Sequence, residues 1–368
     1  MINGQLRILV VDDSAYNRKM VRSMLLEMEE VASVEVVSDG ETAIRTVMTD
    51  PPDLITLDLN MPRMDGFTFL RWLMQNHPLP VVVVSADGGE KNVFKALDLG
   101  ALDFVVKPRR YASERIIEIK EELQTKVRAV GGQDMAPYLG RLRSAKPVRE
   151  RVKAPRRPGT KIHPAGVLVI GASTGGPSAI QRVLTQLPST FPLPVIVVQH
   201  MPPVFTKQFA MRLGKNTAFE AKEAEDGDFL TPGLLLVVPG GYHLEITGSP
   251  SVAVKLRKKR KGDRFVPSID ITMESAAIVF GKRSLGVLLT GMGNDGAHGM
   301  LEIRNAGGRT IAESEESTVV FGMPKAAIRN GAAEVVLPLN TLSGRIEAMA
   351  MDICRLKNES SDARNRGM

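Results

Sequence analysis

Residues 167–180, VLVIGASTGGPSAI, pass from an unbroken apolar run into glycines and small polar residues, and then into a helical pattern. A short apolar run that ends in glycines is typical of a buried strand. Residues 171–175, GASTG, also fit the pattern G-x-S-x-G, in which a sharp strand-to-helix turn exposes a serine hydroxyl. The stretch therefore predicts an α/β fold with either a nucleophilic serine or a phosphate-binding turn at a strand end.

The phosphate-binding alternatives fit these residues less well. A P-loop needs a lysine after its glycines, and GASTGGPS has a proline there. A dinucleotide turn needs a glycine where Ser173 stands, and the next strand, PVIVVQH, ends without an acid for the ribose. A third alternative remains open, in which Ser173 only caps the following helix, because serine is a favoured N-cap residue.

A nucleophilic serine needs a histidine base, and the chain has five candidates, His77, His163, His200, His243 and His298. His200 ends the strand that follows the serine's strand, so both side chains are expected at one sheet edge. Asp295, in LGVLLTGMGNDG, follows a third strand and could orient the imidazole. We therefore predict proton transfer through Ser173, His200 and Asp295, while His298 could also contact Asp295. The backbone N–H of Met292 is the predicted oxyanion donor.

The first third of the chain repeats the α/β pattern. Short β-branched runs (LRILVVDD, SVEVVSD, LITLDL, PVVVVSA and FVVK) alternate with helical patterns in residues 1–128. Five such units predict a doubly wound parallel sheet. The strand ends carry a set of polar residues that suits a divalent cation and a phosphoryl group, namely Asp12, Asp13, Asp58, Ser85 and Lys107. Carboxylates at one edge favour Mg²⁺, and the lysine and serine could contact phosphoryl oxygens.

These segments resemble the receiver domain of bacterial response regulators. The resemblance rests on VVDDS, LDLNMPRMDG, VVVVSA and DFVVKP and covers residues 5–128. It implies a (βα)5 receiver with Asp58 as the phosphorylation site and a Mg²⁺ site formed by Asp12, Asp13 and Asp58. It also implies that Lys107 contacts the phosphoryl group and that Ser85 and Phe104 form a conformational switch. The Asp-Gly-Gly at 87–89 departs from the expected start of the next helix.

Composition limits the compartment and the partners. The chain has 368 residues, 43% of them hydrophobic and 24% charged, which suits a globular protein of two or three domains. A single cysteine, Cys354, excludes an internal disulfide and favours a reducing cytoplasm. Neither a membrane span nor a signal peptide is predicted. The cysteine is expected to pack in the last helix.

The net charge of +7 lies mainly in one segment. Residues 141–161 hold nine Lys or Arg against one acid, Glu150, and their prolines predict an extended linker. A second basic run, KLRKKRK at 255–261, is interpreted as an exposed hairpin tip, or as a docking patch for an acidic protein surface. Neither run has the aromatic residues or recognition helix of a nucleic-acid-binding module, so no nucleic acid is predicted as a partner.

The second half is predicted to be another doubly wound, mostly parallel α/β domain. Its apolar strands are GVLVIGA, PVIVVQH, LGVLLTG and EVVLPL, with helices at PSAIQRVLTQL and DITMESAAIVFG. Turn signals between short strands at 219–246 predict an antiparallel hairpin appendage. The predicted organisation is a receiver at 1–128, a basic linker at 129–164, a catalytic domain at 165–358 and a flexible tail at 359–368.

This half resembles the catalytic domain of chemotaxis protein-glutamate methylesterases, the CheB family, through GASTGGP, VVQHMP, VPSID, LTGMGNDGA and FGMPKAAI. The resemblance implies a cytoplasmic, phosphorylation-regulated serine hydrolase. It would demethylate glutamate methyl esters and deamidate specific glutamines on chemoreceptors, without a cofactor at the hydrolase site. It assigns the triad to Ser173, His200 and Asp295 and an oxyanion contact to Met292.

The same resemblance implies a CheA-type histidine kinase as phosphodonor and no insertion into the membrane. We further expect the linker to keep the receiver near the catalytic domain, where it could restrain the hydrolase until Asp58 is phosphorylated. Two other functions stay open, a non-catalytic regulator whose second half only binds a partner and a hydrolase of small esters.

Overall fold

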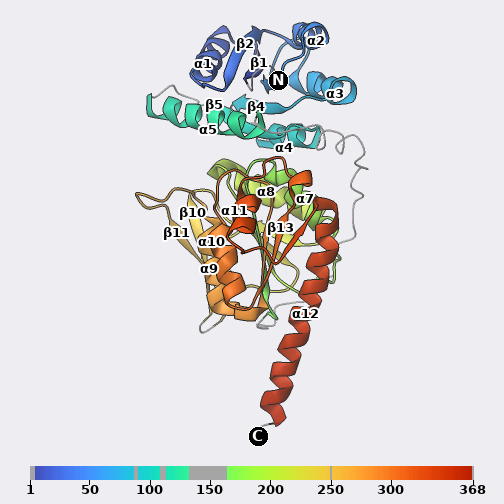
Figure 1. Ribbon diagram of the computed structural model, residues 1–368, viewed down its shortest axis with the longest axis vertical. Coiled ribbons are helices and arrows are strands. Elements are labelled where there is room, and N and C mark those ends of the chain that lie inside the picture. The colour runs from blue at the N-terminus through green and yellow to red at the C-terminus, as the bar shows by residue number, and fades with distance from the viewer. Residues whose placement is uncertain (1–4, 87–89, 108–112, 132–163, 249–250, 367–368) are drawn as a thin grey trace. The chain divides into compact units, whose positions relative to one another are not determined.

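The computed structural model describes residues 5–86, 90–107, 113–131, 164–248 and 251–366 (Figure 1). The chain divides into two compact units, Met1–Lys146 and Pro147–Met368. The predicted linker at 129–164 lies mostly outside the described residues, as does the Asp-Gly-Gly at 87–89.

The first unit is the predicted doubly wound domain. Its parallel strands, in the spatial order β2-β1-β3-β4-β5, are β1 (Leu6–Val11), β2 (Val31–Val37), β3 (Leu54–Leu57), β4 (Val81–Ala86) and β5 (Asp103–Lys107). Its helices are α1 (Ala15–Leu26), α2 (Gly40–Thr49), α3 (Gly66–Asn76), α4 (Glu90–Asp98) and α5 (Ser113–Gly131). The order reverses at the β1/β3 pair, where ligands of open α/β sheets bind.

The second unit is built on a seven-stranded parallel sheet of order β14-β13-β12-β6-β7-β9-β8. The strands are β6 (Val167–Ala172), β7 (Val195–Gln199), β8 (Glu220–Glu223), β9 (Leu234–Val237), β12 (Ser284–Leu288), β13 (Arg309–Glu313) and β14 (Val335–Leu337). Strand β6 is buried along its whole length, as an apolar run covered on both faces should be. The order reverses between β6 and β12, which again predicts a ligand crevice there.

Helices cover both faces of this sheet (Figure 1). They are α7 (Gly176–Leu184), α8 (Pro203–Asn216), α9 (Ile269–Phe280), α10 (Ala297–Asn305), α11 (Met323–Arg329) and α12 (Leu339–Arg366), with 3₁₀ turns η1 (Gly281–Arg283) and η2 (Glu315–Ser317). Cys354 lies in α12, as predicted. Two helices extend past predicted domain limits, because α5 continues to Gly131 and α12 continues to Arg366.

The antiparallel appendage is smaller than the turn signals predict. Within the described residues the antiparallel part consists of β10 (Tyr242–Thr247) paired with β11 (Ala253–Lys258), and an isolated antiparallel bridge between Phe229 and Ala253. Strands β8 and β9 instead join the main sheet in parallel. Their connection contains two left-handed glycines, Gly227 (φ 86°) and Gly233 (φ 85°), so the chain reverses twice and returns to its original direction.

The basic run at 255–261 is not a hairpin tip. Its first half belongs to β11, where Val254 is buried while Lys255 and Lys258 are exposed. The turn follows instead at residues 260–263, where Gly262 has φ 101° and the Asp263 N–H donates to the Arg260 carbonyl at 3.2 Å. Side chains of a strand alternate between its two faces, which explains why apolar Val254 and Leu256 alternate with basic residues in β11.

The apolar core of the second unit joins the sheet to helix α9 and the β10–β11 hairpin. Buried members include Val169, Ile196, Leu236, Met273 and Leu244. Among the described helices of the chain, none is long and apolar enough to cross a membrane.

Candidate active site

Ser173 follows β6 directly and does not cap the next helix. The N-cap of α7 is Gly175, with φ 76° and no side-chain capping bond. A β-carbon at Gly175 would lie 2.5 Å from Val319 Cγ2, so both its conformation and its surroundings require glycine. The interpretation of Ser173 as a helix cap is therefore wrong, and its hydroxyl has no hydrogen-bond partner among the described residues.

The serine turn is held against the end of β12. The Ser173 N–H donates to the Thr290 carbonyl at 3.0 Å, and the Thr290 hydroxyl donates to the Thr174 carbonyl at 2.9 Å. A β-carbon at Gly291 would lie 2.8 Å from Ser173 Cβ. Glycine at this position lets the two strand ends approach closely.

The buried side chain of Gln199 links the serine to the next strand. Its Nε2 donates to the Ser173 carbonyl at 2.9 Å and to the His200 carbonyl at 3.1 Å. A β-carbon at Gly176 would lie 2.1 Å from Gln199 Oε1, so glycine leaves the space that this amide occupies. Ser173 and His200 thus stand at adjacent strand ends, although no hydrogen bond joins their side chains within the described part of the chain.

His200 contacts a carboxylate on one side and an aromatic ring on another. Its Nε2 lies 2.8 Å from Asp295 Oδ2. The imidazole stacks on the Phe265 ring with a centroid distance of 5.1 Å and an interplanar angle of 0°. These contacts fix the plane of the imidazole and leave Nδ1 as its other polar atom.

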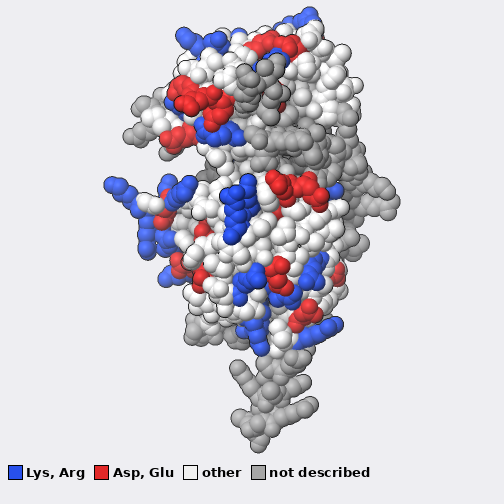
Figure 2. Space-filling model, in the orientation of Figure 1, with Lys and Arg blue, Asp and Glu red and all other residues white. Residues whose placement is uncertain are grey.

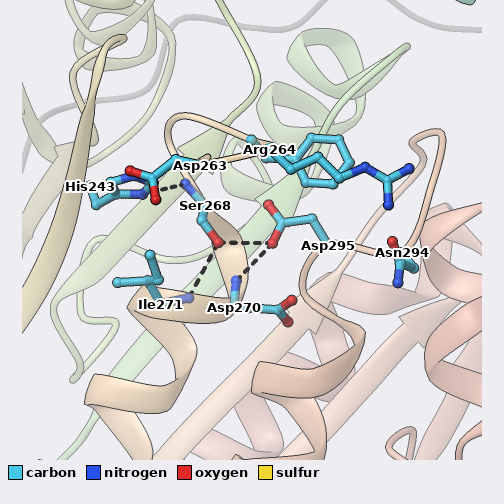
Figure 3. A pocket seen from close by; sticks show the side chains of 9 residues that line it. His243, Asp263, Arg264, Ser268, Asp270, Ile271, Asn294 and Asp295 are labelled. Carbon is cyan, nitrogen blue, oxygen red and sulfur yellow. Dashed lines mark hydrogen bonds and ion pairs between the residues drawn. The ribbon is translucent and has the colours of Figure 1, made fainter. Parts of the chain in front are cut away.

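Asp295 lies at the N-terminus of α9 (Figure 3). Its Oδ1 accepts from the Ser268 hydroxyl at 2.9 Å and the Asp270 N–H at 3.1 Å, while Oδ2 also accepts from the Ile269 N–H at 2.8 Å. Burial favours the protonated acid, but the His200 contact and the backbone donors outweigh it, so the pKa of Asp295 lies below its ordinary value. The residue is therefore a buried, ionised partner for an imidazole.

The loop after β12 carries Met292 between two glycines that lie against Ser173 and Phe265. Gly291 and Gly293 flank it, and Gly293 has φ 90°. The Met292 N–H has no hydrogen-bond partner among the described residues, whereas the Gly291 N–H donates to the Val320 carbonyl at 3.0 Å. An unpaired N–H in a glycine-flanked loop can donate to a developing negative charge.

The other histidines of the second unit make separate contacts. His298 pairs with Glu274 at 3.0 Å and does not contact Asp295, so that alternative is wrong. His243 is buried in β10, where its Nε2 lies 2.9 Å from Asp263 and its Nδ1 accepts from the Ser268 N–H. Both contacts of His243 fix the loop that precedes α9.

A pocket of about 290 Å³ adjoins the His200–Asp295 pair (Figure 3). Arg264, Phe265, Asp270 and Asn294 are among the residues that line it. Burial raises the pKa of Asp270 to about 6, although its bond from the Gly299 N–H opposes the shift. The pocket therefore combines an arginine, an aromatic ring and a carboxyl group whose pKa is raised.

The first unit brings the predicted acids together at the β1/β3 edge. Carboxylate oxygens of Asp12, Asp13 and Asp58 lie within 4.8 Å of one another. Lys107 Nζ lies 2.6 Å from both Asp12 Oδ2 and Asp58 Oδ2. Burial and the charge of Asp12 raise the pKa of Asp58, although Lys107 opposes the shift. Three oxygen donors of this kind suit a hard cation such as Mg²⁺.

The predicted switch residues lie in the adjoining strands. Ser85 is 1% exposed, and its hydroxyl has no hydrogen-bond partner among the described residues. Phe104 is buried beneath Lys126, whose Nζ lies 4.9 Å from the ring centroid and donates to the Phe104 carbonyl. Asp103 and Glu122 pair with the same lysine.

Sequence reasoning missed the residues that support the reacting groups. Gln199, Phe265 and Glu313 had no assigned role, and Glu313 is a fully buried acid that accepts from the Thr290 N–H at 2.9 Å. A polar residue ending the apolar run PVIVV was a signal for Gln199. Ser268 precedes a helical pattern with an acid in its first turn, which is a helix-start signal. No pattern in the sequence pointed to Phe265.

Comparison with known families accounts for both units. Residues 168–346 match the family described as CheB methylesterase, and residues 8–119 match the response regulator receiver domain. A Geobacter sulfurreducens protein described as protein-glutamate methylesterase/protein-glutamine glutaminase 3 is 46% identical over 361 residues, or 93% of this chain and 96% of that protein. An Anaeromyxobacter dehalogenans protein-glutamate methylesterase/protein-glutamine glutaminase 6 is 43% identical over 94% of this chain and 96% of its own length.

Among solved structures, the Thermotoga maritima CheB methylesterase catalytic domain is 41% identical. It covers 50% of this chain and 98% of that chain, with a TM-score of 0.49.

Proposed function

The chain belongs to the CheB methylesterase family, and on that premise we propose that it hydrolyses glutamate methyl esters, and deamidates glutamines, on chemoreceptors. In this proposal Ser173 is the nucleophile, His200 the base and Asp295 its partner. The observation that carries the proposal is the 2.8 Å contact between His200 and a buried aspartate, at the strand end next to that of Ser173.

The acylation step follows from these positions. The Ser173 oxygen attacks the ester carbonyl while His200 accepts the hydroxyl proton at Nδ1, because Nε2 faces Asp295. The developing oxyanion receives a hydrogen bond from the Met292 N–H. Collapse of the intermediate breaks the carbon–methoxy bond, and His200 returns the proton to release methanol.

Deacylation uses the same groups. Water gives a proton to His200 and attacks the glutamyl-serine ester, and His200 then passes this proton to the departing Ser173 oxygen. The glutamic acid that is released loses its own proton to solvent and becomes a carboxylate. With a glutamine substrate the leaving group is ammonia, and every other step is the same. One site can therefore serve both reactions.

The first unit is proposed to control this chemistry by phosphorylation at Asp58, with a CheA-type histidine kinase as donor. Asp12, Asp13 and Asp58 supply three clustered carboxylates that fit Mg²⁺, and they would hold it. The cation would neutralise phosphoryl oxygens during transfer. Lys107 already contacts Asp58, so its ammonium can bind the phosphoryl group once that is attached. Ser85 and Phe104 would then rearrange.

The remaining assignments are proposals of the same kind. The order of receiver, linker and catalytic domain is proposed as the sequence predicts it, with the receiver extended to the end of α5 at Gly131 and the catalytic domain to the end of α12 at Arg366. The single cysteine suits action in the cytoplasm.

The decisive experiment follows methanol release from receptor membranes that carry methyl-labelled glutamates. Wild type should release methanol, and Ser173→Ala should abolish release while leaving the melting temperature unchanged, because only a hydroxyl is removed. Ser189→Ala, an exposed serine after α7, is the matched control and should behave as wild type. Hydrolysis of small esters without any methanol release from receptors would favour a small-ester hydrolase. If Ser173→Ala kept half of the wild-type activity, the assignment of Ser173 as nucleophile would be refuted.

A further inference from the structure

A dense group of cations adjoins the candidate active site. The segment 255–264, KLRKKRKGDR, has seven Lys or Arg and one acid. It spans the end of β11 and the loop that leads to α9. Figure 2 shows Lys and Arg gathered at the edge of the molecule where Figure 1 draws the β10–β11 ribbon.

Most of these charges have no ion-pair partner within the described part of the chain. Arg257 is the exception, because it pairs with Glu245 at 3.4 Å and with Asp263 at 3.3 Å. The remaining exposed cations of the strand end and loop form what we call the basic surface, made of Lys258, Lys259, Arg260, Lys261 and Arg264. Within the described residues none of the five forms an ion pair.

Asp263, the one acid of the loop, forms no ion pair with the side chains of the basic surface in the described structure. Asp263 Oδ2 accepts from the Arg260 N–H at 2.8 Å and contacts the buried His243 at 2.9 Å. These bonds hold the backbone of the loop in place. Five like charges on a fixed loop repel one another, and within the described residues no ion pair of the five offsets the repulsion; only Arg264 has a compensating contact, with the Phe265 ring. Folding alone therefore does not explain the basic surface.

The basic surface is connected to His200 through the side chains of Arg264 and Phe265. The Arg264 guanidinium lies 5.1 Å from the centroid of the Phe265 ring, and that ring stacks on His200 at 5.1 Å. Arg264 and Phe265 also line the pocket that Asp295 shares. A substrate held on the basic surface would thus lie beside the histidine.

We propose that the basic surface binds an acidic polypeptide segment that flanks the glutamate being processed. This inference rests on the proposed function, because it takes the substrate to be a protein that carries glutamates. Each turnover converts a neutral ester or amide into a carboxylate, so the product carries one more negative charge than the substrate. The basic surface then binds the product segment more tightly than the methylated segment.

Two other partner classes fit less well. Single-stranded nucleic acid is usually bound by cations interleaved with exposed aromatic rings, whereas Phe265 is stacked against His200. A membrane-binding loop needs apolar side chains to insert among lipids. Residues 258–264 contain none.

Binding of labelled poly-L-glutamate to the full-length protein tests the surface without catalysis. Poly-L-glutamine of equal length is the neutral probe. The triple variant Lys259→Gln, Arg260→Gln and Lys261→Gln should bind poly-L-glutamate about tenfold more weakly than wild type and with a smaller salt dependence. Equal binding by variant and wild type, or equal binding of the two probes, would overturn the proposal.

The matched control removes the same charge from exposed positions on α8 and α12, through Lys215→Gln, Arg345→Gln and Arg355→Gln. It should bind poly-L-glutamate as wild type does. An equal loss in this control would mean that net charge, and not the basic surface, governs binding. Double-stranded DNA and phosphatidylglycerol vesicles are tested as competitors of labelled poly-L-glutamate. If either displaces the probe more strongly than unlabelled poly-L-glutamate does, the proposal is overturned and that competitor identifies the partner class.

Kinetics separate this proposal from the proposed function. The triple variant should lower kcat/KM for receptor membranes about tenfold and leave hydrolysis of a small neutral methyl ester unchanged. If wild type hydrolyses neither substrate, the proposed function fails, while poly-L-glutamate binding still decides the basic surface. If the variant hydrolyses receptors as wild type does, the inference fails and the hydrolase stands.

Discussion

Replacing Asp295 by asparagine tests the charge beneath His200 with almost no change in shape. Each carboxylate oxygen has two donors in the structure. The amide can keep its oxygen toward His200 and the Ile269 N–H, because the Ser268 hydroxyl can turn and accept from the new NH₂. The Asp270 N–H then loses its acceptor. Asp295→Asn therefore removes one negative charge and leaves one buried donor unpaired.

The expected loss of rate follows from the 2.8 Å separation of His200 Nε2 and Asp295 Oδ2. At an effective dielectric of about 20, a charged pair at this distance is stabilised by about 6 kcal/mol. The remaining amide hydrogen bond keeps about 1–2 kcal/mol of this. The protonated imidazole thus loses about 4 kcal/mol, so kcat should fall by about 10³-fold.

Stability should change with pH in a defined direction. The pKa of Asp295 is depressed in the folded state, so its contribution is present above the unfolded pKa of about 4 and disappears as pH falls through the lower folded value. The unpaired Asp270 N–H should destabilise Asp295→Asn by about 1–3 kcal/mol near neutral pH. The difference from wild type should shrink in acid, as urea unfolding would measure.

The matched control is Asp263→Asn, which makes the same chemical change beside His243, at 2.9 Å. It should alter stability while kcat for methanol release stays within about tenfold of wild type. If folded Asp295→Asn keeps kcat within the same range, the charge of Asp295 does not support His200 and the reasoning above is refuted.

Four further outcomes are expected. His200→Ala should nearly abolish methanol release and His298→Ala should leave it almost unchanged, because His298 pairs with a glutamate outside the site; the reverse ranking would move the base. Asp58→Asn should block labelling by a small phosphodonor in Mg²⁺, and persistent acid-labile label would place the acceptor elsewhere. Asp270→Asn should raise the melting temperature at about pH 8 but not at about pH 4. Folding raises the pKa of this carboxyl group to about 6, so its ionisation at higher pH opposes folding, and the amide removes that cost. Equal shifts of the melting temperature at the two pH values would contradict this. Deleting residues 1–140 should raise basal esterase activity, and equal rates in two well-folded proteins would exclude restraint by the receiver.

Patterns within single strands predicted much of this protein. Apolar runs predicted the five-stranded sheet and strands β6, β7, β12 and β14 of the larger sheet, and polar residues at strand ends put Asp58, Lys107, Ser173 and His200 at the sheet edges where the structure has them. This works because the carboxyl ends of all strands in a parallel sheet lie at one edge, so a residue that directly follows a strand must lie at that edge.

Features that depend on two distant segments were not predictable. The parallel pairing of β8 with β9 depends on two turns within one connection, and each turn alone indicates a hairpin. The stacking of Phe265 on His200 joins a loop to a strand end without any local pattern. Strand β13 was missed because RTIAE has polar residues at both ends.

The amide of Gln199 has a dynamic consequence. One side chain donates to the carbonyls of both Ser173 and His200, so thermal displacement of one strand end pulls the other in the same direction. Their backbone fluctuations should therefore be correlated. The carboxylate of Asp295 is held separately by backbone donors at the start of α9, so the geometry of the proton-transfer chain depends on two independent supports.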